Sequence, residues 1–309
     1  MEKGLQKIFE QYIQECRSIR RLRPETIRGY RSVFLAFTNI MPEILGVNDL
    51  TREALVEFFR RLNDRTRVYS KGLEKRGVKD STVRTYWSKL YSFFEWINNV
   101  HGISNPFTGM VKPPTPIYDD IRALNKDELD KIIAAVVSHN TNALIVKRDI
   151  FIINLFCLCG LRFGEFISLQ LKDVDIDKQL LTVRAETSKS KKERRLKINK
   201  KLMFHLKEYM EERNKRKYKT PYLIVSSIQD KGLSREGLRH WVKRYIELSG
   251  VKFHVHRFRH TFATMLEENN VCASKIQKLM GHQDIKMTMV YLRSTKAEDF
   301  GDELEKLSI

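Results

Sequence analysis

Residues 180–198 read LLTVRAETSKSKKERRLKI, and this stretch decides the fold class because its apolar residues change from the spacing of a helix to that of a strand. Apolar residues occupy alternate positions over 181–185, which is the period of a half-buried strand. A second strand is predicted at 194–198, after a turn at 187–193. With a third short strand predicted at 222–226, the pattern indicates a small antiparallel β-sheet.

Helical periodicity dominates the rest of the chain. A long apolar segment predicts a buried helix at about 148–161, and Asn125 and Glu128 form a capping box that begins another helix. Four amphipathic segments at the N-terminal side suit a small helical bundle; Pro24 begins the second, and Thr51 caps the third. We therefore predict a mainly α protein with a small antiparallel sheet.

Clustered prolines predict a boundary between two domains. Four of the seven prolines fall close together and indicate an extended connection. They are Pro106, Pro113, Pro114 and Pro116. We predict a helical domain at 1–105, a linker at 106–121 and a second, α+β domain at 122–309. A stretch rich in arginine and lysine, 60–79, separates the third and fourth helices of the first domain.

The charge balance indicates a polyanionic partner. The 309 residues include 57 Lys and Arg against 38 Asp and Glu, for a net charge of +19, and the excess is present on both sides of the linker. Two basic domains joined by a linker are suited to clamping a polyanion between them. The four cysteines fit neither a disulfide framework nor a zinc site, and no signal peptide or membrane span is evident. We expect a cytoplasmic protein without metal or cofactor.

Arg162 belongs to the first of four polar motifs, Gly160-Leu161-Arg162 with Glu165, which follows the buried helix. A glycine lets the backbone turn sharply there. An arginine that emerges from a core helix is costly unless it meets an anion. Arg162 is therefore either an anion ligand or half of a structural ion pair with Glu165.

Lysines crowd the tip of the predicted hairpin. Lys189, Lys191 and Lys192 fall within its turn. Such a run is ordinarily a solvated turn. A lysine on a hairpin tip can also reach into a groove, where it acts as a cation or a proton donor.

The third motif places His256, Arg259 and His260 on one face of a helix, at positions i, i+3 and i+4. Three basic groups on one face repel each other unless an anion lies among them. The histidine spacing would also suit a metal, but no carboxylate lies between them and Arg259 would oppose a dication. The pattern therefore favours an anion.

The fourth motif is Gly281-His282, with Tyr291 nine residues after the histidine. Asp284 is predicted to cap a short helix between them. The core stripe expected for that helix is Ile285, Met289 and Leu292. Tyr291 falls off this stripe, so it is either a surface residue or a hydroxyl that faces a site.

Together these residues supply what phosphoryl transfer on DNA requires without a metal. A tyrosine hydroxyl can act as the nucleophile. Arginine side chains match the phosphate oxygens and stabilise the charge of the transition state. Histidine and lysine can accept and donate the protons.

In their order along the chain, the four motifs resemble those of the tyrosine recombinases, the family of phage integrases and Xer-type site-specific recombinases. The family patterns are G-L-R-x-x-E, a lysine in a hairpin followed by arginine, H-x-x-R-H, and G-H with a tyrosine nine positions later. They match Gly160 to Glu165, Lys189 with Arg194, His256 to His260, and Gly281 to Tyr291. The N-terminal helices resemble the family's core-binding domain.

The resemblance implies a role for each residue. Tyr291 would attack a scissile phosphate and form a 3′-phosphotyrosyl bond. Three residues would hold the phosphate: Arg162, Arg259 and His282. Proton transfer would fall to His256 and to Lys189 as the general acid, with Lys191 and Lys192 as alternatives to Lys189. Two residues would support the site: Glu165, which positions Arg162, and His260.

The resemblance also implies partners. These are double-stranded DNA, a synaptic tetramer of this chain that exchanges strands through a Holliday junction, and in some members accessory proteins. The reaction would be Xer-like, or integration and excision of a mobile element. Two alternatives stay open at this point: DNA relaxation as in type IB topoisomerases, and a DNA-binding regulator that does not cut.

A short apolar stripe marks the C-terminal tail. Phe300, Leu304 and Leu307 recur at helical spacing after Tyr291. So short a helix is marginal alone in water and must dock. It would dock either on its own domain or in a groove of a neighbouring protomer.

Overall fold

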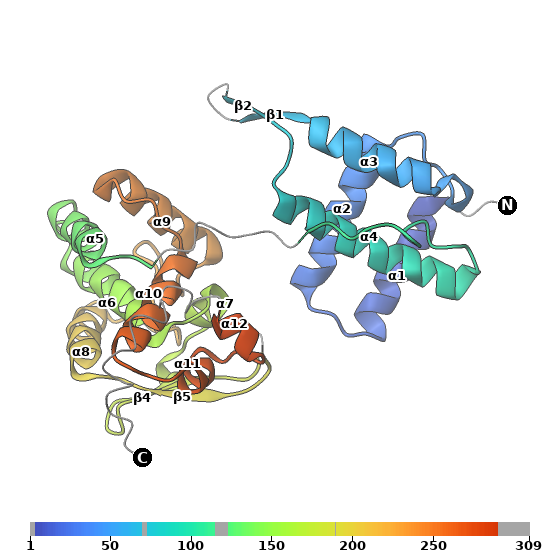
Figure 1. Cartoon of the computed structure of the whole chain (residues 1–309). Coiled ribbons are helices and arrows are strands. Elements are labelled where there is room, and N and C mark those ends of the chain that lie inside the picture. Colours follow the sequence, from blue (N-terminus) through green and yellow to red (C-terminus); the bar gives the residue numbers. More distant parts are fainter. Residues whose placement is uncertain (1–3, 70–72, 115–122, 189, 290–309) are drawn as a thin grey trace, which may run out of the picture. The chain divides into compact units, whose positions relative to one another are not determined.

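Two separate hydrophobic cores organise the protein. In the computed structural model, residues 4–69, 73–114, 123–188 and 190–289 are described. The chain divides into two compact units, Met1–Tyr118 and Asp119–Ile309, each with its own core (Figure 1). The predicted mainly α fold with a small antiparallel sheet is confirmed. The narrower boundaries set at the prolines stay a prediction.

Aromatic side chains fill the core of the first unit. Its helices are α1 (Leu5–Ser18), α2 (Pro24–Ile40), α3 (Arg52–Asp64) and α4 (Asp80–His101), with a short 3-10 turn at Val47–Asp49. Phe9 stacks on Phe34 with ring centroids 3.8 Å apart, and Phe93 meets Phe9 edge-on. The local signals acted as predicted: Pro24 is the first residue of α2, and the Thr51 hydroxyl accepts the Ala54 N–H at 3.2 Å.

A β-hairpin interrupts this bundle between α3 and α4. Strands β1 (Thr66–Tyr69) and β2 (Leu73–Arg76) pair antiparallel. They lie within 60–79, which the sequence indicated only as a basic segment between two helices. The hairpin projects from the end of α3 (Figure 1).

Helix α6 forms the centre of the second unit. The helices of this unit are α5 (Lys126–Ser138), α6 (Ala143–Cys159), α7 (Phe163–Ile167), α8 (Lys200–Lys215), α9 (Arg235–Ser249), α10 (Val255–Glu268), α11 (Ala273–Met280) and α12 (Ile285–Met289). Helix α6 packs against α8 and α10 and is buried along most of its length. It begins earlier than the predicted residue 148 because the Asn142 side chain accepts the Leu144 N–H at 3.1 Å. The capping box of Asn125 and Glu128 is present.

The sheet has three strands in the order β3 (Val174–Asp175), β4 (Leu180–Val183) and β5 (Arg194–Lys197), all antiparallel. The predicted hairpin of β4 and β5 is confirmed, with Leu181 opposite Leu196. The prediction of a third strand at 222–226 is wrong. That segment forms only isolated bridges, because its backbone groups bond alternately to Leu169 and to Leu233 in two different loops.

None of the helices in the described ranges is both long and apolar enough to cross a membrane.

Candidate active site

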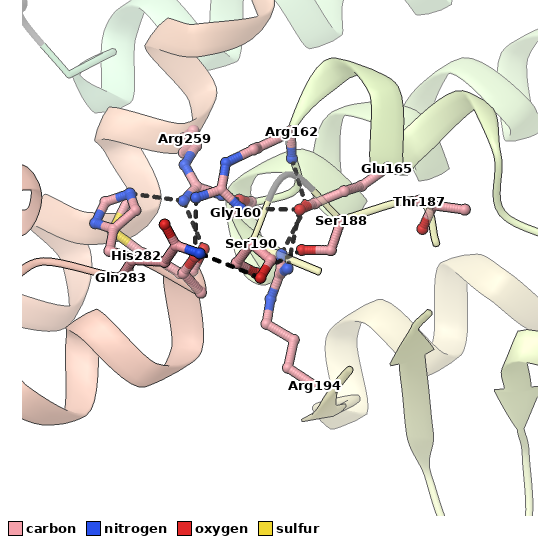
Figure 2. Close-up of polar contacts among 12 residues, drawn as sticks. Gly160, Arg162, Glu165, Thr187, Ser188, Ser190, Arg194, Arg259, His282 and Gln283 are labelled. Atoms are coloured by element: carbon pink, nitrogen blue, oxygen red, sulfur yellow. Dashed lines mark hydrogen bonds and ion pairs between the residues drawn. The ribbon is translucent and has the colours of Figure 1, made fainter. Parts of the chain in front are cut away.

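Arg162, Arg259 and His282 meet in one cluster, although they come from three separate motifs (Figure 2). Arg162 precedes α7, Arg259 lies within α10, and His282 follows α11. The structure thus brings together the three side chains to which the sequence assigned phosphate binding.

Two glycines turn backbone carbonyls toward the arginines. Gly160 ends α6 and Gly281 ends α11, both in the left-handed conformation, with φ of 54° and 64°. A Cβ on Gly160 would collide with the Phe262 ring, and one on Gly281 would press on Arg194. Both positions therefore require glycine for conformation and for space.

Backbone carbonyls hold the Arg259 guanidinium. The side chain is 1% exposed and donates to the carbonyl oxygens of Gly160 and Met280, the latter at 2.6 Å. Its Nη2 also lies 2.8 Å from Nε2 of His282. These carbonyl oxygens orient the buried guanidinium and bear no formal negative charge, unlike a carboxylate.

His282 is a neutral imidazole of defined tautomer. Arginine can only donate, so Nε2 of His282 accepts from Arg259 and the ring proton lies on Nδ1. That Nδ1 lies 2.9 Å from the Thr288 hydroxyl, which is the expected acceptor. Burial, followed by the charges of Arg259 and Arg162, lowers the pKa of His282 to about 3. Thr288 was assigned no role from the sequence; helix α12 brings its hydroxyl next to the His282 ring.

Glu165 connects Arg162 to the sheet. Its carboxylate is 1% exposed, accepts the backbone N–H and Nη1 of Arg162, both at 2.9 Å, and receives two bonds from Arg194 at 3.0 and 2.7 Å. Burial would raise the pKa of Glu165, but the hydrogen bonds and charges of the two arginines lower it to about 2. The structural ion pair is therefore present, and it is compatible with the anion-binding role weighed for Arg162, because a guanidinium has five N–H donors and the bonds to Glu165 and to the Gly281 carbonyl at 3.0 Å use only two of them.

Arg194 is the supporting residue to which the sequence assigned no role. It lies opposite Val183 in the ladder and two residues before the buried Leu196, so it shares the inward face of β5. An arginine at an inward position of a strand needs a buried acid as its partner. This requirement could have identified Arg194 from the sequence as a residue of the site. The acid is Glu165, 29 residues away along the chain.

The predicted face of α10 divides between the interior and solvent. His260 is 6% exposed, and burial, followed by the charges of His256, His254 and Arg259, lowers its pKa to about 4. His256, one turn earlier, is exposed, with its ring centroid 6.5 Å from that of His254. Across the described residues, no three His, Cys, Asp or Glu side chains gather as metal ligands.

The β4–β5 hairpin tip lies against the loop that carries His282. The Gln283 amide donates to the Ser190 carbonyl at 3.2 Å (Figure 2). A cavity of about 700 Å³ opens between the tip and α11. Its lining includes basic and polar side chains from both: Lys192, Arg194, Arg195, Lys278 and His282. An anionic ligand thus has open space beside the cluster.

Several predicted features lie outside the described residues: Lys189, Tyr291, Leu292 and the tail stripe of Phe300, Leu304 and Leu307.

Asp284 caps α12 as predicted, through the Lys286 N–H at 2.9 Å. The core stripe predicted for this helix is wrong, because Ile285 and Met289 are exposed and Thr288 is the buried residue. The inward face of α12 carries the Thr288 hydroxyl, which contacts His282.

The geometry suits the binding of a tetrahedral anion that gains charge during a reaction. Two guanidinium groups and a neutral histidine are fixed by backbone carbonyls, Glu165 and Thr288 before any ligand arrives. Groups fixed in advance stabilise developing charge without reorganisation.

Comparisons with known proteins identify the family. The model of the phage integrase family matches residues 122–298. The tyrosine recombinase XerA of Thermococcus kodakarensis is 30% identical over 243 residues, 76% of this chain and 80% of that protein. The tyrosine recombinase XerD of Listeria monocytogenes is 26% identical over 286 residues, 90% of each chain. A solved structure of a lambda integrase tetramer bound to a Holliday junction has a similar fold, with a TM-score of 0.69, 20% identity and coverage of 99% of this chain and 81% of that one.

The family match spans more than half of the chain, includes all four motifs, and contains the whole Arg162, Arg259 and His282 cluster. The chain is therefore an enzyme of the phage integrase family, a tyrosine recombinase.

Proposed function

We propose that the protein cuts and rejoins double-stranded DNA at a specific site, through a covalent bond between Tyr291 and a 3′ phosphate. The observation that carries this proposal is the fixed cluster of Arg162, Arg259 and neutral His282. Such a cluster is complementary to a phosphate as it gains charge, not to a neutral ligand.

The residues divide the reaction among them. The Tyr291 hydroxyl attacks phosphorus, its proton passes to His256, and the bond to the 5′ oxygen of the next nucleotide breaks. Lys189 donates a proton to that leaving oxygen. Arg162 and Arg259 hold the phosphate oxygens throughout, and His282 keeps Arg259 in position through its Nε2. Rejoining is the reverse reaction, in which a 5′ hydroxyl attacks the phosphotyrosine and releases Tyr291.

The supporting residues keep the phosphate ligands in place. Glu165 orients Arg162 and is itself held by Arg194. His260 is buried beside Arg259, where it stays neutral and adds no competing charge.

Strand exchange requires more than one copy of the chain. The lambda integrase of similar fold is a tetramer on a Holliday junction. We extend this assembly to the present chain: four protomers would hold two duplexes, with the helical first unit and the catalytic second unit both on DNA. The net charge of +19 suits this contact with phosphates. Such a reaction takes place where the DNA substrate lies, which fits the cytoplasmic location expected from the sequence.

A suicide substrate tests the proposal. This duplex has a nick beside the scissile phosphate, so that the short 5′-hydroxyl strand diffuses away and the covalent complex accumulates. An adduct resistant to detergent excludes the regulator that does not cut. Joining of two labelled duplexes then separates a recombinase from a relaxing topoisomerase. Binding without an adduct would contradict the proposal.

Cleavage should continue in excess EDTA. The two arginines supply the positive charge that Mg²⁺ provides in many other phosphoryl-transfer enzymes. Adduct formation is measured with and without chelator, and with Mg²⁺ restored. An absolute requirement for the metal would bring back the interpretation of His256 and His260 as metal ligands.

Lys189→Ala should be rescued by a substrate with sulfur in place of the 5′ bridging oxygen. A thiolate is a good leaving group and needs no acid, so the substrate restores what the missing lysine supplied. Cleavage rates are compared on the oxygen and sulfur substrates. Lys191→Ala and Lys192→Ala are the matched controls, and rescue of either one in place of Lys189→Ala would move the general acid to that position.

Acidification from pH 6.5 to 5 should destabilise the folded protein. The pKa values of His282 and His260 are lowered to about 3 and about 4, whereas the unfolded chain takes up their protons near 6.5. The unfolded state therefore binds more protons in this window. The contribution is complete above pH 6.5 and falls with pH, by at most about 1.4 kcal/mol per pH unit for each histidine.

Chemical denaturation at several pH values measures this loss, and His260→Gln should reduce its slope. The shift of Glu165 acts only below its ordinary pKa of 4.5 and does not interfere. A flat profile in the parent protein would show that the two histidines are not held neutral.

A further inference from the structure

Helix α12 presents a hydroxyl, not an apolar side chain, to the interior of its unit. Among its described residues, Ile285–Met289, Thr288 is fully buried at 0% exposure, whereas Ile285, Met287 and Met289 are exposed. An amphipathic helix ordinarily turns its apolar side chains inward. The inward position of α12 is therefore occupied by a residue that can form a hydrogen bond, while apolar residues of the same helix lie in contact with solvent.

Apolar packing alone would hold this helix weakly. Helix α12 has five residues, and a helix of that length is unstable in water without tertiary contacts. It packs beside α11, and its buried contact is made by the Thr288 hydroxyl, which lies 2.9 Å from Nδ1 of His282. This hydrogen bond therefore anchors α12 to the phosphate-binding cluster.

The same bond sets which ring nitrogen of His282 carries the proton. The Thr288 hydroxyl accepts from Nδ1, so Nε2 is unprotonated and accepts from Nη2 of Arg259 at 2.8 Å. In the other tautomer, the Nε2–H would face an N–H of Arg259, donor against donor. The tautomer that Thr288 favours is thus the one that binds the guanidinium.

This line of hydrogen bonds connects three helices. Thr288 lies in α12, His282 follows α11, and Arg259 lies in α10; Figure 2 shows the link between His282 and Arg259. Arg259 also donates to the Met280 carbonyl at the end of α11, at 2.6 Å. Buried hydrogen bonds in such a chain strengthen one another, because each polarises the next. A change in the seating of α12 is therefore transmitted to Arg259 through a single imidazole ring.

We propose that Thr288 is a positioning residue, which couples the seating of α12 to the orientation of Arg259 through the tautomer of His282. The inference rests on the proposed function, in which Arg259 stabilises the phosphate. Tyr291 stands three positions after Thr288 in the sequence. One bond would thus assemble the cation of the transition state together with the helix that precedes the nucleophile. A protomer whose α12 is displaced would lack the full set of bonds that orient Arg259.

Thr288→Val and Thr288→Ser, made in the full chain, separate the hydroxyl from the rest of the side chain. Valine keeps the volume and the branching of threonine but cannot accept the Nδ1 proton, whereas serine keeps the hydroxyl. Thr261→Val is the matched control. Thr261 is also buried in this unit, and its hydroxyl accepts the Leu124 N–H at 2.7 Å, a bond that does not involve His282.

Single-turnover cleavage of the nicked suicide duplex is measured at saturating protein. Thr288→Val should cleave on the order of tenfold more slowly, the effect expected when a buried donor loses its acceptor. Thr288→Ser should stay close to the parental rate. In a His282→Ala background, Thr288→Val should lower the rate no further, because the hydroxyl acts through the ring. Thr261→Val should lose stability but cleave at the parental rate.

Two measurements on the protein without DNA test the coupling directly. The chain has eight histidines, and the nitrogen NMR signals of the His282 ring are identified by their loss in His282→Ala. In the parent protein these signals should report a proton on Nδ1, and in Thr288→Val they should shift toward the form protonated on Nε2. Hydrogen exchange of segment 283–289 should accelerate in Thr288→Val and in His282→Ala, but not in Thr288→Ser or Thr261→Val.

A proton on Nε2 in the parent protein, or an unchanged tautomer or cleavage rate in Thr288→Val, would overturn the inference. Defects that multiply in the double variant would show that the hydroxyl acts apart from the ring, and an equal loss of cleavage in Thr261→Val would reduce the effect to stability. Unchanged exchange of 283–289 in Thr288→Val would contradict the anchoring of α12. The tautomer and the exchange are measured without cleavage, so they decide the inference even if the wild-type chain forms no adduct, the result that would contradict the proposed function.

Discussion

Tyr291→Phe should abolish the covalent protein–DNA adduct completely while leaving DNA binding nearly unchanged. The substitution removes one oxygen atom, the proposed nucleophile, and keeps the aromatic ring. A suicide duplex with a 3′ label measures the adduct on a denaturing gel, and a mobility shift measures binding.

Tyr222→Phe is the matched control for this experiment. Tyr222 is a partly exposed tyrosine of the same unit, at 38% exposure, and lies in a different pocket from the arginine cluster. Its variant should form the adduct at the parental rate. An adduct that persists in Tyr291→Phe would move the nucleophile to another residue, and loss of DNA binding in that variant would give the tyrosine a structural role instead.

The order of the four motifs was sufficient to predict the family and to name the three side chains that meet in the cluster, Arg162, Arg259 and His282, because each motif is a local pattern. Helix caps were likewise predictable, since Thr51 and Asn125 bond within three residues of themselves. Such features depend on neighbours along the chain, which a sequence displays directly.

The groups that hold the ligands in place were not predictable in the same way. The partners of Arg259 include the backbone oxygens of Gly160 and Met280, and a carbonyl has no sequence signature. Arg194 reaches Glu165 only because β5 pairs with β4 and returns beside α7. Thr288 was assigned to no role because apolar spacing at Ile285 and Met289 suggested the opposite face of α12.

The hairpin of β1 and β2 was missed for a different reason. Its strands have few apolar residues on either face, so the period that reveals a half-buried strand is missing from 66–76. The third strand predicted at 222–226 failed in the opposite way. Leu223, Ile224 and Val225 are buried as a strand would be, but their backbone partners are divided between two loops.

These long-range contacts explain why the side chains of the site are held in position before substrate arrives. Each phosphate ligand has a partner of its own: Arg162 has Glu165, and His282 has Thr288. Arg259 has the carbonyl oxygens of Gly160 and Met280, which orient it and bear no formal charge. It is therefore the group whose loss should cost the most among the phosphate ligands.

Arg259→Ala should lower the single-turnover cleavage rate on the order of 10²-fold or more, the range found for other groups that stabilise transition-state charge. Arg259→Lys should recover little of this loss, because one ammonium cannot serve two carbonyls, a histidine and a phosphate at once. The cleavage rate of Arg162→Ala should fall by a factor in the same range. Cleavage is measured at saturating protein, so that weaker binding does not enter the rate.

Arg257→Ala separates chemistry from folding, because Arg257 lies on the same helix but pairs with Glu128 at 2.9 Å. Both alanine variants should lose stability in thermal unfolding, and only Arg259→Ala should lose cleavage. Arg259 also lowers the pKa of His282, so its removal should raise that pKa, although burial, the larger cause, keeps it below 6.5. The imidazole titration, followed by NMR, reports this change directly. If cleavage fell equally in both variants, or if only the affinity for DNA changed, Arg259 would position the helix or the substrate rather than stabilise the transition state.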